Sequence, residues 1–163
     1  LCRIALDKLK KTYEQDIQEK NIRIIFDNLT LSLMMEVNVE QFSKVLAGIL
    51  KNSMYALLKK SETVTFSPEI FLGLKVNKDM LEITIRDNGS GIDENIKDKI
   101  FAPFFTTKTT GEAAGVGLYL CREIVQNHRG TIEVESKKGE YTQFLITIPV
   151  YQPKTITPPK EEE

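Results

Sequence analysis

The chain has 163 residues, of which 41% are apolar and 28% charged, and its formal net charge is −1. This is the composition of a globular protein with one compact core. Because the charge is nearly balanced and Lys and Arg are interspersed with Asp and Glu, the sequence carries no electrostatic footprint for nucleic acid or a membrane surface. Partners must therefore be recognised at a local site.

Cysteine content and the chain start bear on location. Two cysteines, Cys2 and Cys121, are too few and too far apart for a disulfide framework or a cysteine-based zinc site, which predicts a reducing compartment such as the cytoplasm. No apolar run approaches the roughly 20 residues that span a bilayer, and no signal-peptide pattern is present. Since the chain begins with Leu1, we expect it to belong to a longer protein whose membrane anchor or sensor segment lies outside these residues.

The first third of the chain predicts two helices with a small β unit between them. Apolar residues recur every three or four positions over 4–20, which predicts an amphipathic helix. Two β-prone runs, 22–26 and 31–39, predict a hairpin that opens a sheet. An apolar stripe at helical spacing predicts the central helix over 40–58.

The next two strands end on an aspartate. Runs 70–76 and 81–86 are joined by a polar three-residue link and should pair antiparallel. Because side chains alternate along a strand, Asp87 points to the same inner face as Ile85, and a buried carboxylate needs a donor. A ligand with an amino group would supply one. The alternative is that Asp-Asn-Gly forms an ordinary turn.

The rest of the chain predicts a loop, a helix and two strands. Residues 93–117 combine short apolar islands with several glycines, so we expect a long mobile loop that acts as a lid. Apolar spacing predicts a helix over 118–128, with Gly130 suited to its C-terminal cap. Strands are expected at 131–135 and 142–150.

Five short motifs follow one another along these elements. They are the helix segment 45–57 around Asn52, Asp87-Asn88-Gly89-Ser90-Gly91, the Phe-Ala-Pro-Phe-Phe-Thr-Thr-Lys run at 101–108, Gly115-Val116-Gly117-Leu118, and Gly139-Glu140-Tyr141-Thr142. Each is weak alone, but in this order they resemble the asparagine, glycine and phenylalanine boxes of the catalytic, ATP-binding domain of sensor histidine kinases. The resemblance implies an α+β fold, a two-layer sandwich of the Bergerat type with a mixed, mostly antiparallel sheet and three helices on one face.

Residue chemistry agrees with this resemblance. Asp87 can accept a hydrogen bond from the exocyclic amine of adenine, and Gly91 lets the backbone approach the ring. Asn52 can offer its amide oxygen to Mg²⁺ between the phosphates, and Lys108 can reach the γ-phosphate, although either residue alone would be read as solvated. Asn52 and Lys108 are the expected catalytic residues, and Asn52 is the expected metal ligand. The full set expected to bind the nucleotide is Asn52, Tyr55, Asp87, Gly89, Gly91, Ile92, Phe101, Thr107, Lys108, Gly115, Val116, Gly117, Leu118 and Thr142.

The resemblance also implies partners. The γ-phosphoryl group of Mg-ATP would pass to a histidine on a separate dimerising helical domain of a homodimeric parent protein, and then to the receiver domain of a response regulator. The single histidine of this chain, His128, is expected to cap a helix and not to accept phosphate. The expected divisions are a helical junction at 1–20, the ATP-binding domain at 21–151 and a proline-rich tail or linker at 152–163.

Three positions depart from the family pattern. Gly48 stands where the family usually has a second asparagine, Ala113 where the glycine cluster of the lid usually has another glycine, and Tyr55 where many members have a basic side chain. Phosphate binding would then rely more on Lys108, Lys51 or Arg122. The departures at Gly48 and Tyr55 keep open a non-catalytic nucleotide-sensing module as an alternative. A serine kinase or ATPase on the same fold is a second alternative, against which the Phe-Phe-Thr-Thr-Lys run argues.

Overall fold

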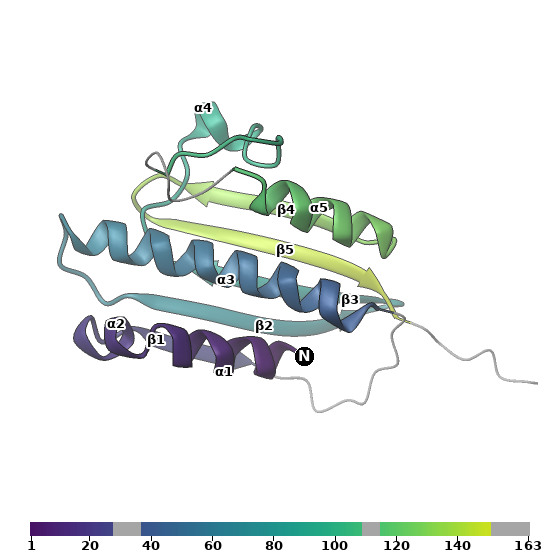
Figure 1. The fold of residues 1–163 in the computed structure, drawn as a ribbon, viewed down its shortest axis with the longest axis horizontal. Coiled ribbons are helices and arrows are strands. Elements are labelled where there is room, and N and C mark those ends of the chain that lie inside the picture. Colours follow the sequence, from purple (N-terminus) through teal and green to yellow (C-terminus); the bar gives the residue numbers. More distant parts are fainter. Residues whose placement is uncertain (28–36, 109–114, 151–163) are drawn as a thin grey trace, which may run out of the picture.

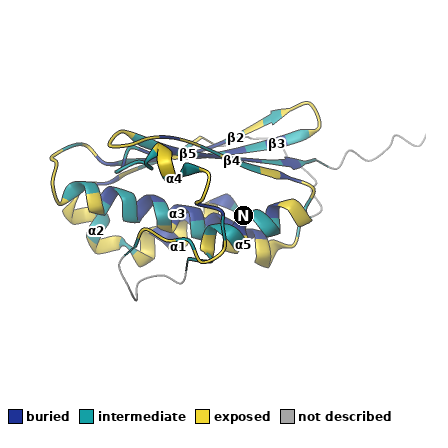
Figure 2. Cartoon of the chain, turned by 90° about the horizontal axis from the view of Figure 1, so that it is seen from above, coloured by how far each residue is buried: buried dark blue, intermediate teal, exposed yellow. Residues whose placement is uncertain are grey.

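The computed structural model describes residues 1–27, 37–108 and 115–150. They form two layers, a five-stranded sheet and a set of helices on one of its faces (Figure 1). Figure 2 shows α1, α3 and α5 together on that side of the sheet. The predicted α+β sandwich, with a mixed and mostly antiparallel sheet, is therefore confirmed.

The sheet has the strand order β1-β2-β3-β5-β4. β1 and β2 are parallel, and every other neighbouring pair is antiparallel. The strands are β1 (Arg23–Asp27), β2 (Glu69–Asn77), β3 (Met80–Asp87), β4 (Thr131–Lys137) and β5 (Tyr141–Pro149). The runs predicted at 70–76 and 81–86 are β2 and β3, and their expected antiparallel pairing is confirmed.

Five helices lie in the described part of the chain. They are α1 (Cys2–Thr12), α2 (Glu14–Glu19), α3 (Val39–Ser61), α4 (Glu94–Lys97) and α5 (Gly117–Asn127). Within these ranges no helix combines the length and apolarity that crossing a membrane requires.

The core lies between α3 and the inner face of the sheet. Alternation on β3 buries Leu81, Ile83 and Ile85, and β5 does the same with Phe144, Ile146 and Ile148. α3 covers them with its fully buried stripe of Phe42, Leu46, Ile49, Leu50, Met54 and Leu57. Each such side chain contributes about 1.5–3 kcal/mol by leaving water.

The helix expected over 4–20 is two helices. α1 ends at Thr12 and α2 begins at Glu14, because Tyr13 (φ −114°, ψ 27°) leaves the helical conformation. The single-helix prediction is therefore wrong at this residue. α1 packs against α3 and buries its apolar face in the common core, whereas α2 has no buried residue.

The run expected over 31–39 falls largely outside the described residues. Its last residue, Val39, begins α3, so the strand prediction is wrong there. The cause is Asn38, whose side-chain oxygen accepts a hydrogen bond from the Gln41 N–H at 3.0 Å and starts the helix as an N-cap. The expected tail at 152–163 also lies outside the described residues.

The segment expected as one irregular loop, 93–117, contains α4. Asp93 begins this helix by accepting a hydrogen bond from the Asn95 N–H at 3.0 Å. Four residues are too few to show an apolar period, which is why the pattern did not predict a helix. Residues 109–114 of the expected lid lie outside the described part of the chain.

The left-handed residue that caps the C-terminus of α5 lies one position earlier than predicted. Arg129 takes the left-handed conformation (φ 59°), and not Gly130. Arg129 N–H donates to Gln126 O at 2.8 Å and Gly130 N–H to Val125 O at 3.0 Å, which are the two hydrogen bonds of a Schellman motif. The prediction of Gly130 as the capping residue is therefore corrected by one position.

His128 joins the end of α5 to the start of α3. Its Nε2 accepts a hydrogen bond from the Asn38 N–H at 2.9 Å, so Nδ1 carries the proton and donates to Ile124 O at 2.7 Å. The ring also packs edge-on against Phe42. The prediction that this histidine is structural and caps helix carbonyls is confirmed.

Candidate functional site

A cavity of about 530 Å³ lies between α3, the segment that follows β3 and the start of α5. All the expected site residues line it except Gly89 and Phe101. Those that line it are Asn52, Tyr55, Asp87, Gly91, Ile92, Thr107, Lys108, Gly115, Val116, Gly117, Leu118 and Thr142. Another hollow of about 520 Å³, between α1, α2 and β1, is lined by none of the expected site residues.

The two expected residues that do not line the cavity support residues that do. The Gly89 N–H donates a hydrogen bond to Asp87 Oδ1 at 3.0 Å. Phe101 is buried and packs edge-on against Phe144, which lines the cavity. Gly89 and Phe101 therefore lie behind the residues that form the cavity wall.

Asp87 is the buried carboxylate of the cavity, with 3% of its surface exposed. Burial disfavours its charged form and raises its pKa to about 6, although the Gly89 N–H, Ser53, Lys60 and Arg86 oppose the rise. The alternation along β3 thus aims Asp87 inward as predicted. A carboxylate with this pKa is ionised at pH 7 only against a desolvation cost, which a hydrogen-bond donor in the cavity would offset.

Ser53 is a cavity residue whose role the sequence did not reveal. It lies on the buried stripe of α3, is 1% exposed and lines the cavity beside Asp87. Its hydroxyl lies close enough to Asp87 to favour the charged carboxylate, but within the described residues Oγ makes no hydrogen bond of regular geometry. A buried hydroxyl in this condition is costly unless a ligand or water satisfies it. The only available signal was one small polar residue inside an otherwise apolar helical stripe.

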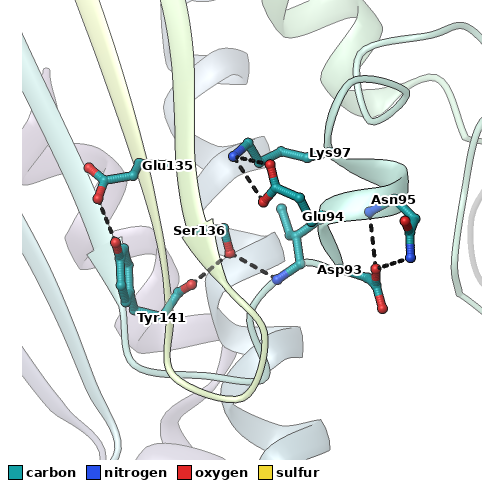
Figure 3. Close-up of polar contacts among 8 residues, drawn as sticks. Asp93, Glu94, Asn95, Lys97, Glu135, Ser136 and Tyr141 are labelled. Carbon is teal, nitrogen blue, oxygen red and sulfur yellow. Dashed lines mark hydrogen bonds and ion pairs between the residues drawn. The ribbon is translucent and has the colours of Figure 1, made fainter.

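Thr142 lies next to Asp87 because the two residues are directly paired in the β3–β5 register. Figure 3 shows how Ser136 anchors this corner. Ser136 Oγ accepts a hydrogen bond from the Ile92 N–H at 2.8 Å and donates to Tyr141 O at 2.6 Å. Since its proton is committed, Thr142 is the donor in the 3.1 Å contact between the two hydroxyls. Ser136 therefore fixes Ile92, a wall of the cavity, against β4 and β5.

Two glycines allow close backbone contacts at the rim. Gly91 has φ +64°, and a Cβ there would lie 2.2 Å from Lys137 O. The β4–β5 turn therefore requires a glycine at this position. This reason differs from the predicted one, which was close approach of the backbone to an adenine ring. Gly115 has φ +70°, and a Cβ there would lie 2.6 Å from the carbonyl carbon of Phe104. It holds the residues before Lys108 close to the start of α5.

The lining of the cavity carries an excess of positive charge. Its lysines are Lys51, Lys59, Lys108 and Lys138, against two aspartates, Asp87 and Asp93. Lys138 Nζ pairs with Asp93 Oδ2 at 2.7 Å. Arg122, an expected alternative phosphate contact, does not line the cavity and lies over the Phe101 ring at 5.7 Å. The excess of lysines suits an anionic ligand.

The start of α5 adds helix N–H donors to the same cavity. Val116 is its N-cap and makes no side-chain capping hydrogen bond. The first N–H groups of a helix lack partners within the helix and attract anions. Because Val116, Gly117 and Leu118 line the cavity, an anion bound there can use these donors.

Asn52 and Lys108 meet at the cavity, although they are far apart in sequence. Lys108 Nζ donates to Asn52 Oδ1 at 3.2 Å and lies 4.6 Å from the centre of the Tyr55 ring.

Gly48, one turn earlier on α3, faces Cys121 of α5, and a Cβ there would lie 3.2 Å from Sγ. Burial raises the pKa of the Cys121 thiol to about 11, so it stays protonated.

The chemistry of the donor set fits a metal that arrives with its ligand. Among residues 1–27, 37–108 and 115–150, no cluster of three or more His, Cys, Asp or Glu side chains could hold a metal ion. Asn52 Oδ1 is a hard oxygen on the cavity wall. Mg²⁺ commonly takes one or two protein oxygens and completes its shell with phosphate and water.

Comparison with known proteins agrees with this geometry. A model of the family described as "Histidine kinase-, DNA gyrase B-, and HSP90-like ATPase" matches residues 38–152. Cyanobacterial phytochrome A of Nostoc sp. (strain PCC 7120) is 35% identical over 149 residues, which are 90% of this chain and 18% of that protein. Sensor histidine kinase ZraS of Salmonella typhi is 29% identical over 136 residues, or 83% of this chain and 28% of that protein.

A solved structure resembles the fold over nearly its whole length. The catalytic domain of histidine kinase ThkA has a TM-score of 0.72 and 27% sequence identity, and the match covers 90% of this chain and 91% of that one. The chain thus spans a minor part of the two curated relatives and almost all of an isolated catalytic domain.

Proposed function

Since the chain belongs to the family of histidine kinase-, DNA gyrase B- and HSP90-like ATPases, as its motifs predicted, we propose that it binds Mg-ATP and transfers the γ-phosphoryl group to a histidine on a separate helical domain. The observation that carries the proposal is one cavity that combines the buried carboxylate of Asp87 with lysines, the open start of α5 and Asn52.

Asp87 recognises adenine in this proposal. Its carboxylate accepts a hydrogen bond from the exocyclic amine, which offsets the desolvation cost that raises its pKa to about 6. Ser53 Oγ, which is buried and unsatisfied within the described residues, supplies a second polar group to the same end of the ligand. A base without an exocyclic amine would leave both groups without compensation.

The phosphates lie among the cationic groups. Lys108 and Lys51 supply positive charge, and the N–H groups at the start of α5 face the chain of phosphate oxygens. Asn52 Oδ1 is the side-chain ligand for Mg²⁺, which neutralises phosphate charge when bound. The remaining expected residues that line the cavity, among them Thr107 and Val116, shape the wall around the nucleotide.

Chemistry requires little from this chain beyond orientation. The bond between the γ-phosphorus and the bridging oxygen of ADP breaks, a bond from phosphorus to an imidazole nitrogen forms, and the imidazole proton passes to solvent. A neutral imidazole with a pKa of about 6.5 is a competent nucleophile near pH 7, so the site needs no strong base of its own. Lys108 and the α5 donors hold the phosphate chain in line for attack.

The wider organisation follows from the same proposal. Residues 21–151 form the ATP-binding domain, 1–20 a junction from an upstream dimerising helical domain, and 152–163 a linker. The parent protein is a cytoplasmic or membrane-anchored homodimer whose phosphohistidine supplies a response regulator. The departures at Gly48 and Tyr55 keep one alternative function open, a module that binds the nucleotide without transfer.

A transfer assay separates these functions. The chain is mixed with labelled Mg-ATP and the helical domain of its parent protein, and acid-labile phosphohistidine is measured together with nucleotide affinity. We expect Asp87→Asn to weaken ATP binding at least tenfold, and Asn52→Ala to abolish transfer while retaining much of the binding. Lys44→Met, an exposed change on the same helix outside the cavity, is the matched control. ATP binding without phosphohistidine would support the sensing module, and normal transfer by Asn52→Ala would refute the metal assignment.

A further inference from the structure

Tyr55 and Lys108 form a contact that the proposed function has not used. The ammonium group of Lys108 lies 4.6 Å from the centre of the Tyr55 ring, within the range of a cation–π interaction, and it also donates to Asn52 Oδ1 at 3.2 Å. We propose, building on the proposed function, that Tyr55 is a positioning residue, which keeps Lys108 beside the phosphates through its ring face.

Asn52 and Tyr55, two of the groups that Lys108 contacts, come from one face of α3. Asn52 and Tyr55 are three residues apart on the helix, so their side chains are neighbours on its surface. Tyr55 is half-buried and lines the cavity, as Lys108 does. A long lysine side chain loses much rotamer freedom when it is held in one place, and two anchors on a rigid helix offset that loss.

The two anchors differ in what a metal does to them. Asn52 Oδ1 is the oxygen assigned to Mg²⁺, and a dication on that oxygen would repel the ammonium group that now shares it. The ring of Tyr55 is not a ligand of the kind that Mg²⁺ takes, since this ion prefers hard oxygens. Of these two anchors, Tyr55 is therefore the one that would persist when Mg-ATP binds, and it would retain Lys108 near the phosphate oxygens.

Lys59 provides a comparison within the same site. Its Nζ lies 5.9 Å from the Tyr55 ring, at the outer limit for a cation–π contact, and Lys59 is exposed. Lys108 lies closer to the ring and has Asn52 as a second partner. The ring therefore favours Lys108, the cation that comes from the loop before α5.

The first test needs no nucleotide. The rate of amine acylation at each lysine of the 163-residue chain is measured by mass spectrometry. We expect Tyr55→Leu and Tyr55→Gln to accelerate labelling of Lys108 about two- to fivefold, as loss of a partly exposed cation–π contact implies. Tyr55→Phe keeps the ring and should keep the protection. Lys44, on the same helix and paired with Glu40, is the internal standard. Unchanged labelling of Lys108 in both ring-deleting variants would overturn the proposal.

The second test is a double-mutant cycle on nucleotide affinity. Affinities for Mg-AMP-PNP and for AMP are measured by calorimetry for the native chain, Tyr55→Leu, Lys108→Met and the double variant. If Tyr55 acts through Lys108, the double variant binds AMP-PNP no more weakly than Lys108→Met, and Tyr55→Leu costs about two- to fivefold. AMP, which lacks the β- and γ-phosphates, should show no such coupling.

The outcomes separate this proposal from the one it builds on. Additive losses in the cycle would overturn the positioning role of Tyr55 and leave ATP binding in place. Failure of the native chain to bind AMP-PNP at all would sink the proposed function, and the acylation test would still decide whether Tyr55 holds Lys108. Tyr55→Phe removes only the hydroxyl and keeps the ring. It should preserve the coupling to Lys108 if the ring face holds the ammonium group, and it should lose the coupling if the hydroxyl is responsible.

Discussion

Replacement of Asp87 by asparagine should stabilise the fold in a pH-dependent way. Burial raises the pKa of Asp87 from 3.8 to about 6. The pKa difference is about 2, and each pKa unit corresponds to about 1.36 kcal/mol. Ionising this carboxyl therefore costs the folded state up to about 3 kcal/mol. Asparagine has nearly the same shape, keeps an oxygen for the Gly89 N–H and never ionises. The native residue therefore lowers stability at neutral pH.

The sign of the effect defines the assay. In the unfolded chain an aspartate ionises near its ordinary pKa of 3.8, whereas folded Asp87 keeps its proton until about pH 6. The stability of the native chain thus falls through this group as pH rises from about 4 to 6, and it stays lowered above pH 6. Urea unfolding followed by circular dichroism should show the advantage of Asp87→Asn growing by up to about 3 kcal/mol between pH 4 and pH 7.5, or roughly 9 °C in Tm.

A matched change separates burial from loss of charge. Asp98→Asn removes a carboxylate from an exposed position after α4 and should show no comparable advantage that grows between pH 4 and pH 7.5. An advantage of Asp87→Asn that is flat across this range, or a variant less stable than the native chain at pH 7.5, would refute the reasoning. The same substitution is expected to weaken ATP binding, so stability and recognition should move in opposite directions.

Three further predictions concern the site and its supports. A hydrogen-bond donor from adenine favours ionised Asp87, so ATP affinity should rise as pH increases through about 6 and then level off. Calorimetry at about pH 6 in buffers of different ionisation enthalpy should then detect release of a proton on binding. Binding without proton release would contradict this prediction. Ser136→Ala leaves the Ile92 N–H and the Tyr141 carbonyl without their partner, and should cost about 1–3 kcal/mol in urea unfolding; Ser136→Thr, which keeps the hydroxyl, tests whether the bond is responsible. Gly115→Ala combines positive φ with a 2.6 Å clash and should cost more than about 1 kcal/mol, whereas Gly117→Ala, where nothing lies within 4 Å of a Cβ, should cost less.

Local patterns were sufficient where one face of an element is buried. The period of two on β3 and the helical stripe on α3 reflect burial against each other, so both elements and the inward direction of Asp87 could be predicted. Patterns failed where the deciding interaction is not periodic. The break at Tyr13, the four-residue α4 and the left-handed Arg129 depend on single hydrogen bonds or backbone angles that leave no repeat in the sequence.

The sequence by itself determined the order of the motifs, because local alternation and glycine spacing act within a few positions of the chain. The resemblance of those motifs to the ATP-binding domain of sensor histidine kinases implied the α+β class and most of the predicted cavity residues, but not Ser53. Only the tertiary structure decided which of these residues touch. The β3–β5 register pairs Asp87 with Thr142, Ser136 ties Ile92 to the last hairpin, and Lys108 reaches Asn52 and Tyr55 across the fold. These contacts join segments that are distant in sequence, and packing of the helices on the sheet sets them, which no local pattern encodes.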